Sequence, residues 1–292
     1  MVFITGMEKY YFLFGLALVW IIFAVFSDFR KGNEVPDWLT FSLIVFALAY
    51  RAFFSAYSSD WMFFVYGLLG FSLFFILGNL FYYSKMVGGA DAKLLFGLGA
   101  VMPIEGLWGV VSIGCGFILV LFFVGAVYSL IYSVFLVRKN YKKFSKAFGK
   151  NLGRKSIVGF MFVFAIFLIL LIYFLFGFDL LMLFLGIVFA FLFFGLVVYT
   201  KSLDVCMIKL VSPKKLTEGD WIMGDIKLNH GTIKKTVHGL SASDIAKLRK
   251  AGKMVLVKEG IPFTPAFLLA FLIMGFFFLV LKVDWLAVLF SF

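Results

Sequence analysis

Apolar residues fill long, nearly unbroken runs along most of this chain, and polar residues are confined to the stretches between them. The first run, YYFLFGLALVWIIFAVF, occupies residues 10–26, and several later runs are of similar length or longer. An α-helix rises 1.5 Å per residue, so about 20 apolar residues cross the roughly 30 Å hydrocarbon core of a bilayer. The pattern therefore predicts about eight membrane-spanning helices. They cover residues 9–27, 38–57, 61–83, 92–104, 107–137, 156–177, 180–200 and 264–282.

Residues 201–262 break this pattern and predict a small folded domain. The stretches GTIKKTV and KMVLVKEG predict short strands, and SASDIAKLRKAG predicts a helix with Ser241 as its N-cap and Gly252 as its stop. The predicted fold class is an all-α polytopic membrane protein with a small α+β insertion. Its parts are a membrane domain over residues 1–200, the α+β domain over 201–262, and a last span and tail over 263–292.

Composition supports a membrane protein and excludes several other classes. The 292 residues are 64% hydrophobic and 14% charged, with a mean hydropathy of +1.08, whereas soluble domains are nearer half apolar and a quarter charged. The two cysteines form no CxxC pair, so neither a disulfide framework nor a zinc site is expected. No metal or other cofactor is expected.

The basic residues predict the orientation of the chain in the membrane. Residues 138–155, RKNYKKFSKAFGKNLGRK, hold eight Lys and Arg and no acid, which indicates a cytoplasmic loop. Alternation of the spans then places all of the 27 Lys and Arg on the cytoplasmic side except Lys9, Arg51 and Lys282. Topology and attraction to anionic lipids thus explain the net charge of +12, and no nucleic-acid partner is expected. The pattern gives no account of Arg51 within the second span.

Two acids stand where a charge close to lipid is costly. Asp28 follows the first span and Asp91 precedes the fourth, so both are expected at the cytoplasmic face. The fourth span is short, about 18 Å of helix, and must begin below the lipid headgroups where its neighbours shield it. Gly88 and Gly89 are expected to permit the sharp or unwound backbone that such an entry needs.

Two carboxylates that meet near a low-dielectric boundary would share a proton. The ionised one can take a proton from water while the protonated one donates to a carbonyl oxygen, which is the chemistry of an aspartyl protease. An alternative is an ion- or proton-coupled transporter that uses the same two acids. Transporters contain inverted repeats and bind near the bilayer midplane, whereas both acids lie near one face and no repeat is visible.

Two motifs around these acids resemble the prepilin peptidase family, particularly its archaeal prepilin and preflagellin branch. The first is DFR followed by VPDWLT, and the second is GGAD, which occupies the place of the family's GxGD motif with an alanine for its second glycine. The segment GLSASDIAKLRKAGKMVLVKEGIPFTPAF also resembles the cytoplasmic segment and re-entry of archaeal members. The residues that carry the two motifs are Asp28, Pro36, Gly88, Gly89, Ala90 and Asp91.

The resemblance implies an integral-membrane aspartyl endopeptidase that removes the short basic leader of class III signal peptides. Its partners would be single-span prepilin or preflagellin precursors, and it assigns a catalytic role to Asp28 and Asp91 only. Neither zinc nor methyl transfer is implied, because this chain lacks the cysteine pairs of bacterial members. Other membrane proteases, of the presenilin or signal-peptide-peptidase kind, share the GxGD motif. The DFR and VPDWLT segment argues against them.

Two further acids, Glu34 and Asp37, lie close to Asp28 in sequence on the otherwise positive face. They are expected to receive the basic leader of the substrate. The helix dipole gives a second explanation for Asp37, because an acid is favourable at a helix start.

Overall fold

The structure is a computed structural model of the 292-residue chain. It describes residues 8–30, 35–84, 86–176, 180–228, 231–236, 239–258 and 260–281. The chain divides into two compact units, and each is described by itself. The first unit comprises Met1–Leu130 and Ile261–Phe292, and the second comprises Ile131–Gly260.

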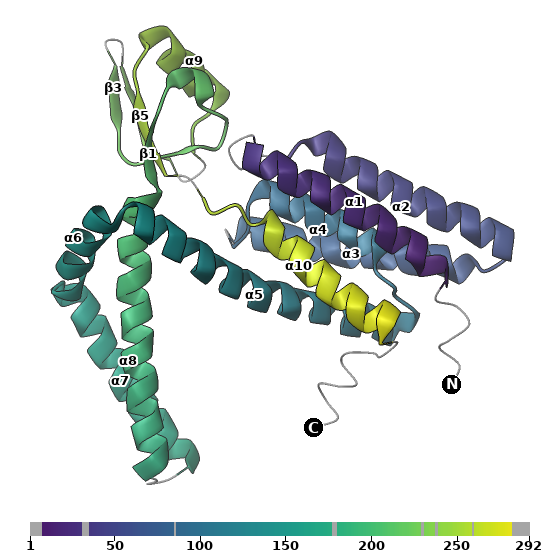
Figure 1. Cartoon of the computed structure of the whole chain (residues 1–292), viewed down its shortest axis with the longest axis horizontal. Helices are drawn as coiled ribbons and strands as arrows, with labels where there is room; N and C mark the ends of the chain where they lie inside the picture. Colours follow the sequence, from purple (N-terminus) through teal and green to yellow (C-terminus); the bar gives the residue numbers. More distant parts are fainter. Residues whose placement is uncertain are drawn as a thin grey trace. The chain divides into compact units, whose positions relative to one another are not determined.

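The first unit is a bundle of apolar helices whose members lie side by side in Figure 1. Its last helix ends in a π-helical turn, Phe276–Val280. Helix α1 packs on α10, and the rings of Phe14 and Phe271 stack at 5.0 Å between them. The helices are α1 (Glu8–Arg30), α2 (Asp37–Ser58), α3 (Trp61–Tyr83), α4 (Gly89–Val101), the first part of α5 (Gly106–Lys139), and α10 (Thr264–Gly275).

The short helix α4 lies at the centre of this unit, against α2 and α3. All of its residues from Leu94 to Val101 are buried. Gly70 of α3 and Gly99 of α4 bring the two backbones into contact, since a Cβ on either would lie 2.4–2.6 Å from the other's carbonyl oxygen. Small residues permit such close approach of membrane helices. The predicted shielding of the short fourth helix by its neighbours is therefore confirmed.

The second unit begins with three helices, α6 (Tyr141–Leu152), α7 (Lys155–Phe176) and α8 (Leu180–Leu203). Helix α6 occupies the segment that the sequence predicted as a loop. Its aromatic residues Phe144 and Phe148 are four positions apart and so share a helix face, and Phe144 packs edge-on against Tyr199 of α8. The dense positive charge hid this amphipathic pattern, because the lysines occupy the other face.

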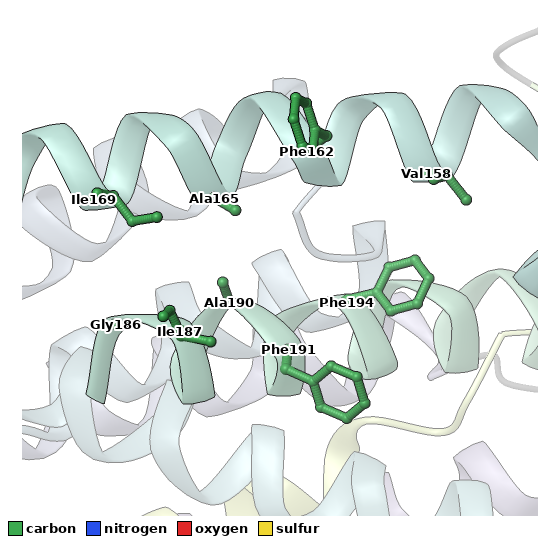
Figure 2. Close-up of a pocket in the computed structure, with 9 residues that line it drawn as sticks. All are labelled: Val158, Phe162, Ala165, Ile169, Gly186, Ile187, Ala190, Phe191 and Phe194. Atoms are coloured by element: carbon green, nitrogen blue, oxygen red, sulfur yellow. The ribbon is translucent and has the colours of Figure 1, made fainter. Parts of the chain in front are cut away.

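A groove between α7 and α8 is lined entirely by apolar residues, among them Phe162, Ile169, Ile187 and Phe194. Figure 2 shows these side chains on the two facing helices. The groove offers no group that could take part in acid–base or nucleophilic chemistry, so the candidate site lies elsewhere.

The polar part of the second unit is an α+β domain with two antiparallel sheets. One has the strand order β1-β5-β2 and the other pairs β3 with β4. The strands predicted in GTIKKTV and KMVLVKEG are confirmed as β4 and β5, while the other three were not predicted. The elements are η1 (Asp204–Met207), β1 (Ile208–Val211), η2 (Pro213–Lys215), β2 (Trp221–Ile222), β3 (Ile226–Leu228), β4 (Gly231–Ile233), α9 (Ala242–Ala251) and β5 (Val255–Lys258).

Helix α9 begins and ends where the sequence predicted. The Ser241 Oγ accepts a hydrogen bond from the Asp244 amide at 3.3 Å, and Gly252 ends the helix with a φ of +61°. Ile245 and Leu248 on its inner face are buried against Val255 and Val257 of β5.

Each apolar segment predicted to span the membrane is helical in the structure. Five helices in the described part of the chain are long and apolar enough to cross a bilayer, and two apolar helices are shorter. The five are Lys9–Arg30, Asp37–Ser58, Trp61–Tyr83, Trp108–Lys139 and Leu180–Met207, and the shorter two are Val158–Phe174 and Thr264–Val280. The count of eight spans stays a prediction.

Candidate active site

Asp28 lies in the last turn of α1, and its side chain is buried against the start of α10. The residue is only 4% exposed. Its Oδ2 accepts a hydrogen bond from the Oγ1 of Thr264 at 2.7 Å and another from the Thr264 amide at 3.4 Å. Thr264 is the first residue of α10 and is itself 1% exposed. Two segments that are 236 positions apart in sequence therefore meet at this carboxylate.

Asp91 lies in the first turn of α4 and is half-buried. Its Oδ2 accepts a hydrogen bond from the amide of Gly88, the N-cap residue, at 3.3 Å. This is one half of a capping box, in which an acid at the third helical position reaches back to the N-cap amide. The positive end of the helix dipole also favours an anion here. The fold therefore gives Asp91 a local structural role besides any chemical one.

Asp28 and Asp91 lie at the same end of the first unit. Helices α1 and α4 are in contact, and the two carboxylates lie within electrostatic range of each other. Within the described residues, neither acid forms an ion pair, and each uses only its Oδ2 as an acceptor for a protein hydrogen bond. Two neighbouring acids, each with an oxygen left over for water or substrate, are the arrangement that a proton-sharing pair requires.

The glycines of the GGAD motif take ordinary backbone angles. Gly88 has φ −71° and ψ 162°, which any residue can adopt, and Gly89 is the first residue of α4. The chain bends at residues 86–87 and is extended at Gly88, so the entry to α4 is non-helical without a left-handed glycine. A Cβ on Gly88 would lie 3.2 Å from Oδ2 of Asp91, and one on Gly89 would lie 3.4 Å from the ring of Tyr82. Ala90 packs against the core of the unit.

The residues around Pro36 link the start of α2 to α4. Pro36 is the N-cap of α2, with φ −62°, and its carbonyl accepts the Leu39 amide at 3.0 Å. Asp37 begins the helix and forms an ion pair with Lys93, which lies two residues after Asp91. The carboxylate predicted to bind a basic leader thus already has a cationic partner. Glu34, the other such acid, lies outside the described residues.

Arg51, which the sequence left unexplained, closes the other end of α4. The residue is completely buried. Its guanidinium donates to the carbonyls of Ala100 at 2.8 Å, Met102 at 2.6 Å and Val101 at 3.4 Å, and to that of Phe63 at 2.8 Å. The last carbonyls of a helix have no partner within the helix, so Arg51 satisfies those of α4. The sequence signal was a single charge in an apolar span, but only the tertiary structure supplies its partners.

Comparisons with known proteins cover the segment that contains the two aspartates. Residues 15–134, which contain both, match the model of the type IV leader peptidase family. The chain is 37% identical over 73 residues to a preflagellin peptidase of Methanocaldococcus jannaschii, a stretch covering 25% of this chain and 31% of that protein. It is 35% identical over 83 residues to one of Methanococcus maripaludis, covering 28% and 35%.

A preflagellin peptidase of Methanococcus voltae is 28% identical over 90 residues, covering 31% of this chain and 38% of that protein. The chain thus spans only about a third of the length of these curated relatives. No solved structure matches the chain. Over residues 15–134, which contain both aspartates, the chain is similar to the type IV leader peptidase family, and over shorter stretches it is similar to archaeal preflagellin peptidases, which confirms the resemblance seen in its motifs.

Proposed function

We propose that this chain is an integral-membrane aspartyl endopeptidase that cleaves the short basic leader from class III signal peptides. The observation that carries the proposal is the meeting of Asp28 and Asp91 at one end of the first unit. They come from the last turn of one apolar helix and the first turn of another, so both lie where a membrane-spanning segment ends. The match of residues 15–134, which contain both aspartates, to the type IV leader peptidase family supports this reading, and so does the similarity to preflagellin peptidases.

The proposed reaction is acid–base catalysis by the pair. The ionised aspartate takes a proton from a water molecule, whose oxygen attacks the carbonyl carbon of the scissile peptide bond. The protonated aspartate donates its proton to the carbonyl oxygen. When the resulting tetrahedral intermediate collapses, the C–N bond breaks and the leaving amine takes the proton that came from the water. The step needs no metal ion, and we propose that no cofactor takes part.

The proposed substrate is a single-span prepilin or preflagellin precursor whose basic leader lies on the cytoplasmic side. Glu34 and Asp37 remain the proposed acids for binding that leader. Because Lys93 is paired with Asp37, a basic substrate side chain would have to displace this lysine to use the carboxylate. In this orientation, the α+β domain also lies on the cytoplasmic side, and the basic segment around α6 contacts anionic lipids.

The decisive experiment co-expresses the chain with a panel of candidate precursors and follows loss of the leader by gel mobility. Asp28→Asn and Asp91→Asn should each lower the cleavage rate by about 100-fold or more, which is the low end of what general acid–base groups contribute. Asp60→Asn is the matched control, because Asp60 is an acid of the same unit that pairs with Lys9 at 3.8 Å. It should cleave like wild type.

Expression and membrane insertion are checked for every variant. Undiminished cleavage by either Asp28→Asn or Asp91→Asn would contradict the aspartyl mechanism. If wild type cleaves none of the precursors while the same two acids are needed for ion or proton flux in vesicles, the transporter alternative replaces the peptidase.

A further inference from the structure

Thr264 contacts Asp28 through two donors, and it lies outside the two aspartate motifs and outside the residues of the family match. The matched residues end at 134, whereas Thr264 follows the α+β domain. Its hydroxyl and its amide both donate to the same oxygen, Oδ2 of Asp28, at 2.7 and 3.4 Å. Within the described part of the chain, these are the hydrogen bonds that Asp28 accepts. A buried carboxylate is thus held by a single residue from a distant segment.

The hydroxyl of Thr264 does not serve its own helix. The N-cap of α10 is Phe263, and the capping function in which a side-chain oxygen accepts an amide of the first turn belongs to that position. The Thr264 hydroxyl instead donates across to another helix. The amide of Thr264 is also one of the first-turn donors that lack a partner within a helix, and Pro265, the next residue, has no amide hydrogen to offer.

Packing holds Phe263, the residue before Thr264, in place. Phe263 lies against Gly125 of α5, where a Cβ would come within 2.4 Å of the Phe263 ring. The ring of Phe263 also meets that of Phe267 edge-on at 5.9 Å. The branched side chain of threonine has few χ1 rotamers to choose from, so the hydroxyl is held in place before any substrate binds.

We propose that Thr264 is a positioning residue for Asp28. It fixes the plane of the carboxylate by holding Oδ2, so that Oδ1 faces the water and the scissile carbonyl. This inference rests on the proposed peptidase function. The proposed site therefore consists of the start of α10 as well as the two aspartate motifs. Helix α10, which follows the α+β domain in sequence, completes the active site.

The test compares Thr264→Val with Thr264→Ser in the full-length protein, using purified enzyme and a precursor that wild type cleaves. Valine keeps the shape and removes the hydroxyl, while serine keeps the hydroxyl. We expect Thr264→Val to lower kcat by about 10- to 100-fold, which is the scale of a slightly misplaced catalytic group. KM should change by less than about twofold, because the hydroxyl does not contact substrate. Thr264→Ser should recover kcat to within about threefold of wild type, because it restores the same donor.

Ser55→Ala is the control for loss of a buried hydroxyl, since Ser55 is fully buried in α2. It should leave kcat and KM unchanged. Thermal unfolding in detergent is measured for each variant, and Thr264→Ala replaces the valine variant if valine lowers the yield of folded protein. A kcat for Thr264→Val and Thr264→Ala equal to that of wild type would overturn the inference, and so would failure of serine to recover kcat.

The Asp28→Asn variant, run in parallel, separates the two levels of the proposal. If Asp28→Asn is inactive and Thr264→Val is fully active, only the positioning role fails. If Asp28→Asn cleaves normally, the proposed peptidase mechanism fails, and the positioning role fails with it.

Discussion

The two ends of the first unit hold their buried charges in opposite ways. At one end, Arg51 is completely buried and donates four hydrogen bonds to backbone carbonyls. At the other end, Asp28 is nearly as buried, yet its hydrogen bonds within the described residues come from Thr264, and it lies within electrostatic range of another acid, Asp91. A buried charge with all its hydrogen bonds is costly to disrupt, whereas two like charges near each other disfavour the ionisation of both.

The difference indicates which end performs chemistry. The Arg51 end is further closed by Lys9, which pairs with Glu105 at 3.2 Å, and by Tyr10, whose hydroxyl donates to Glu105 at 3.2 Å. Opposite charges are matched there. At the aspartate end, neither Asp28 nor Asp91 forms an ion pair within the described residues, and groups with perturbed charge of this kind gather at active sites. One short helix, α4, connects the two ends, so the satisfied end fixes the position of the reactive one.

The largest effect on stability is expected from Arg51→Met. The substitution removes four hydrogen bonds to backbone carbonyls, and each buried acceptor left without a partner costs about 1–3 kcal/mol. The measurement is unfolding in detergent, by heat or by denaturant. Arg138→Met is the control, because Arg138 is an exposed arginine of α5 and its loss should cost about 0.5 kcal/mol or less. Asp28→Asn should also cost little, and an equal loss for Asp28→Asn and Arg51→Met would break the contrast between the two ends.

A smaller effect is expected where α4 touches α3. In Gly99→Ala the new Cβ would lie 2.6 Å from the carbonyl oxygen of Gly70, so α4 must shift, at a cost of about 1–3 kcal/mol. Because α4 carries Asp91, cleavage should slow as well. Gly15→Ala is the control in α1, since a Cβ there meets no atom within 4 Å, and it should be neutral or slightly stabilising. Equal unfolding curves for the two variants would show that this backbone contact does not constrain α4.

The smallest effect is expected from the ion pair between Lys93 and Asp37. The two side chains are 34% and 62% exposed, and exposed ion pairs contribute about 0.2–1 kcal/mol. A double-mutant cycle with Lys93→Gln and Asp37→Asn should give a coupling energy in this range that decreases as salt is added. A coupling energy that is larger and independent of salt would mean that the pair is structurally important, as the contacts of Arg51 are, and would contradict the contrast between the two ends.

Local patterns predicted most of the secondary structure because those patterns are themselves local. Runs of about 20 apolar residues can satisfy their backbone in lipid only as helices, so each predicted span is a helix. The Ser241 cap and the Gly252 stop of α9 are likewise properties of a few neighbouring residues. Helix α6 was not predicted because the two aromatic residues on one of its faces, Phe144 and Phe148, lie among lysines. Strands β1, β2 and β3 were not predicted because strands of two to four residues show little periodicity.

The sequence by itself determined that this chain is largely apolar helix and that Asp28 and Asp91 fall at the ends of apolar segments, while the side of the membrane that its basic residues favour stays a prediction. Tertiary structure decided what each buried charge contacts. Arg51 and Thr264 meet partners that are 49 and 236 positions away in sequence, and no periodicity connects such positions. The physical reason is that a buried charge must find its hydrogen-bond partners in space, and only the packing of α4 and α10 against α1, α2 and α3 defines where those partners are.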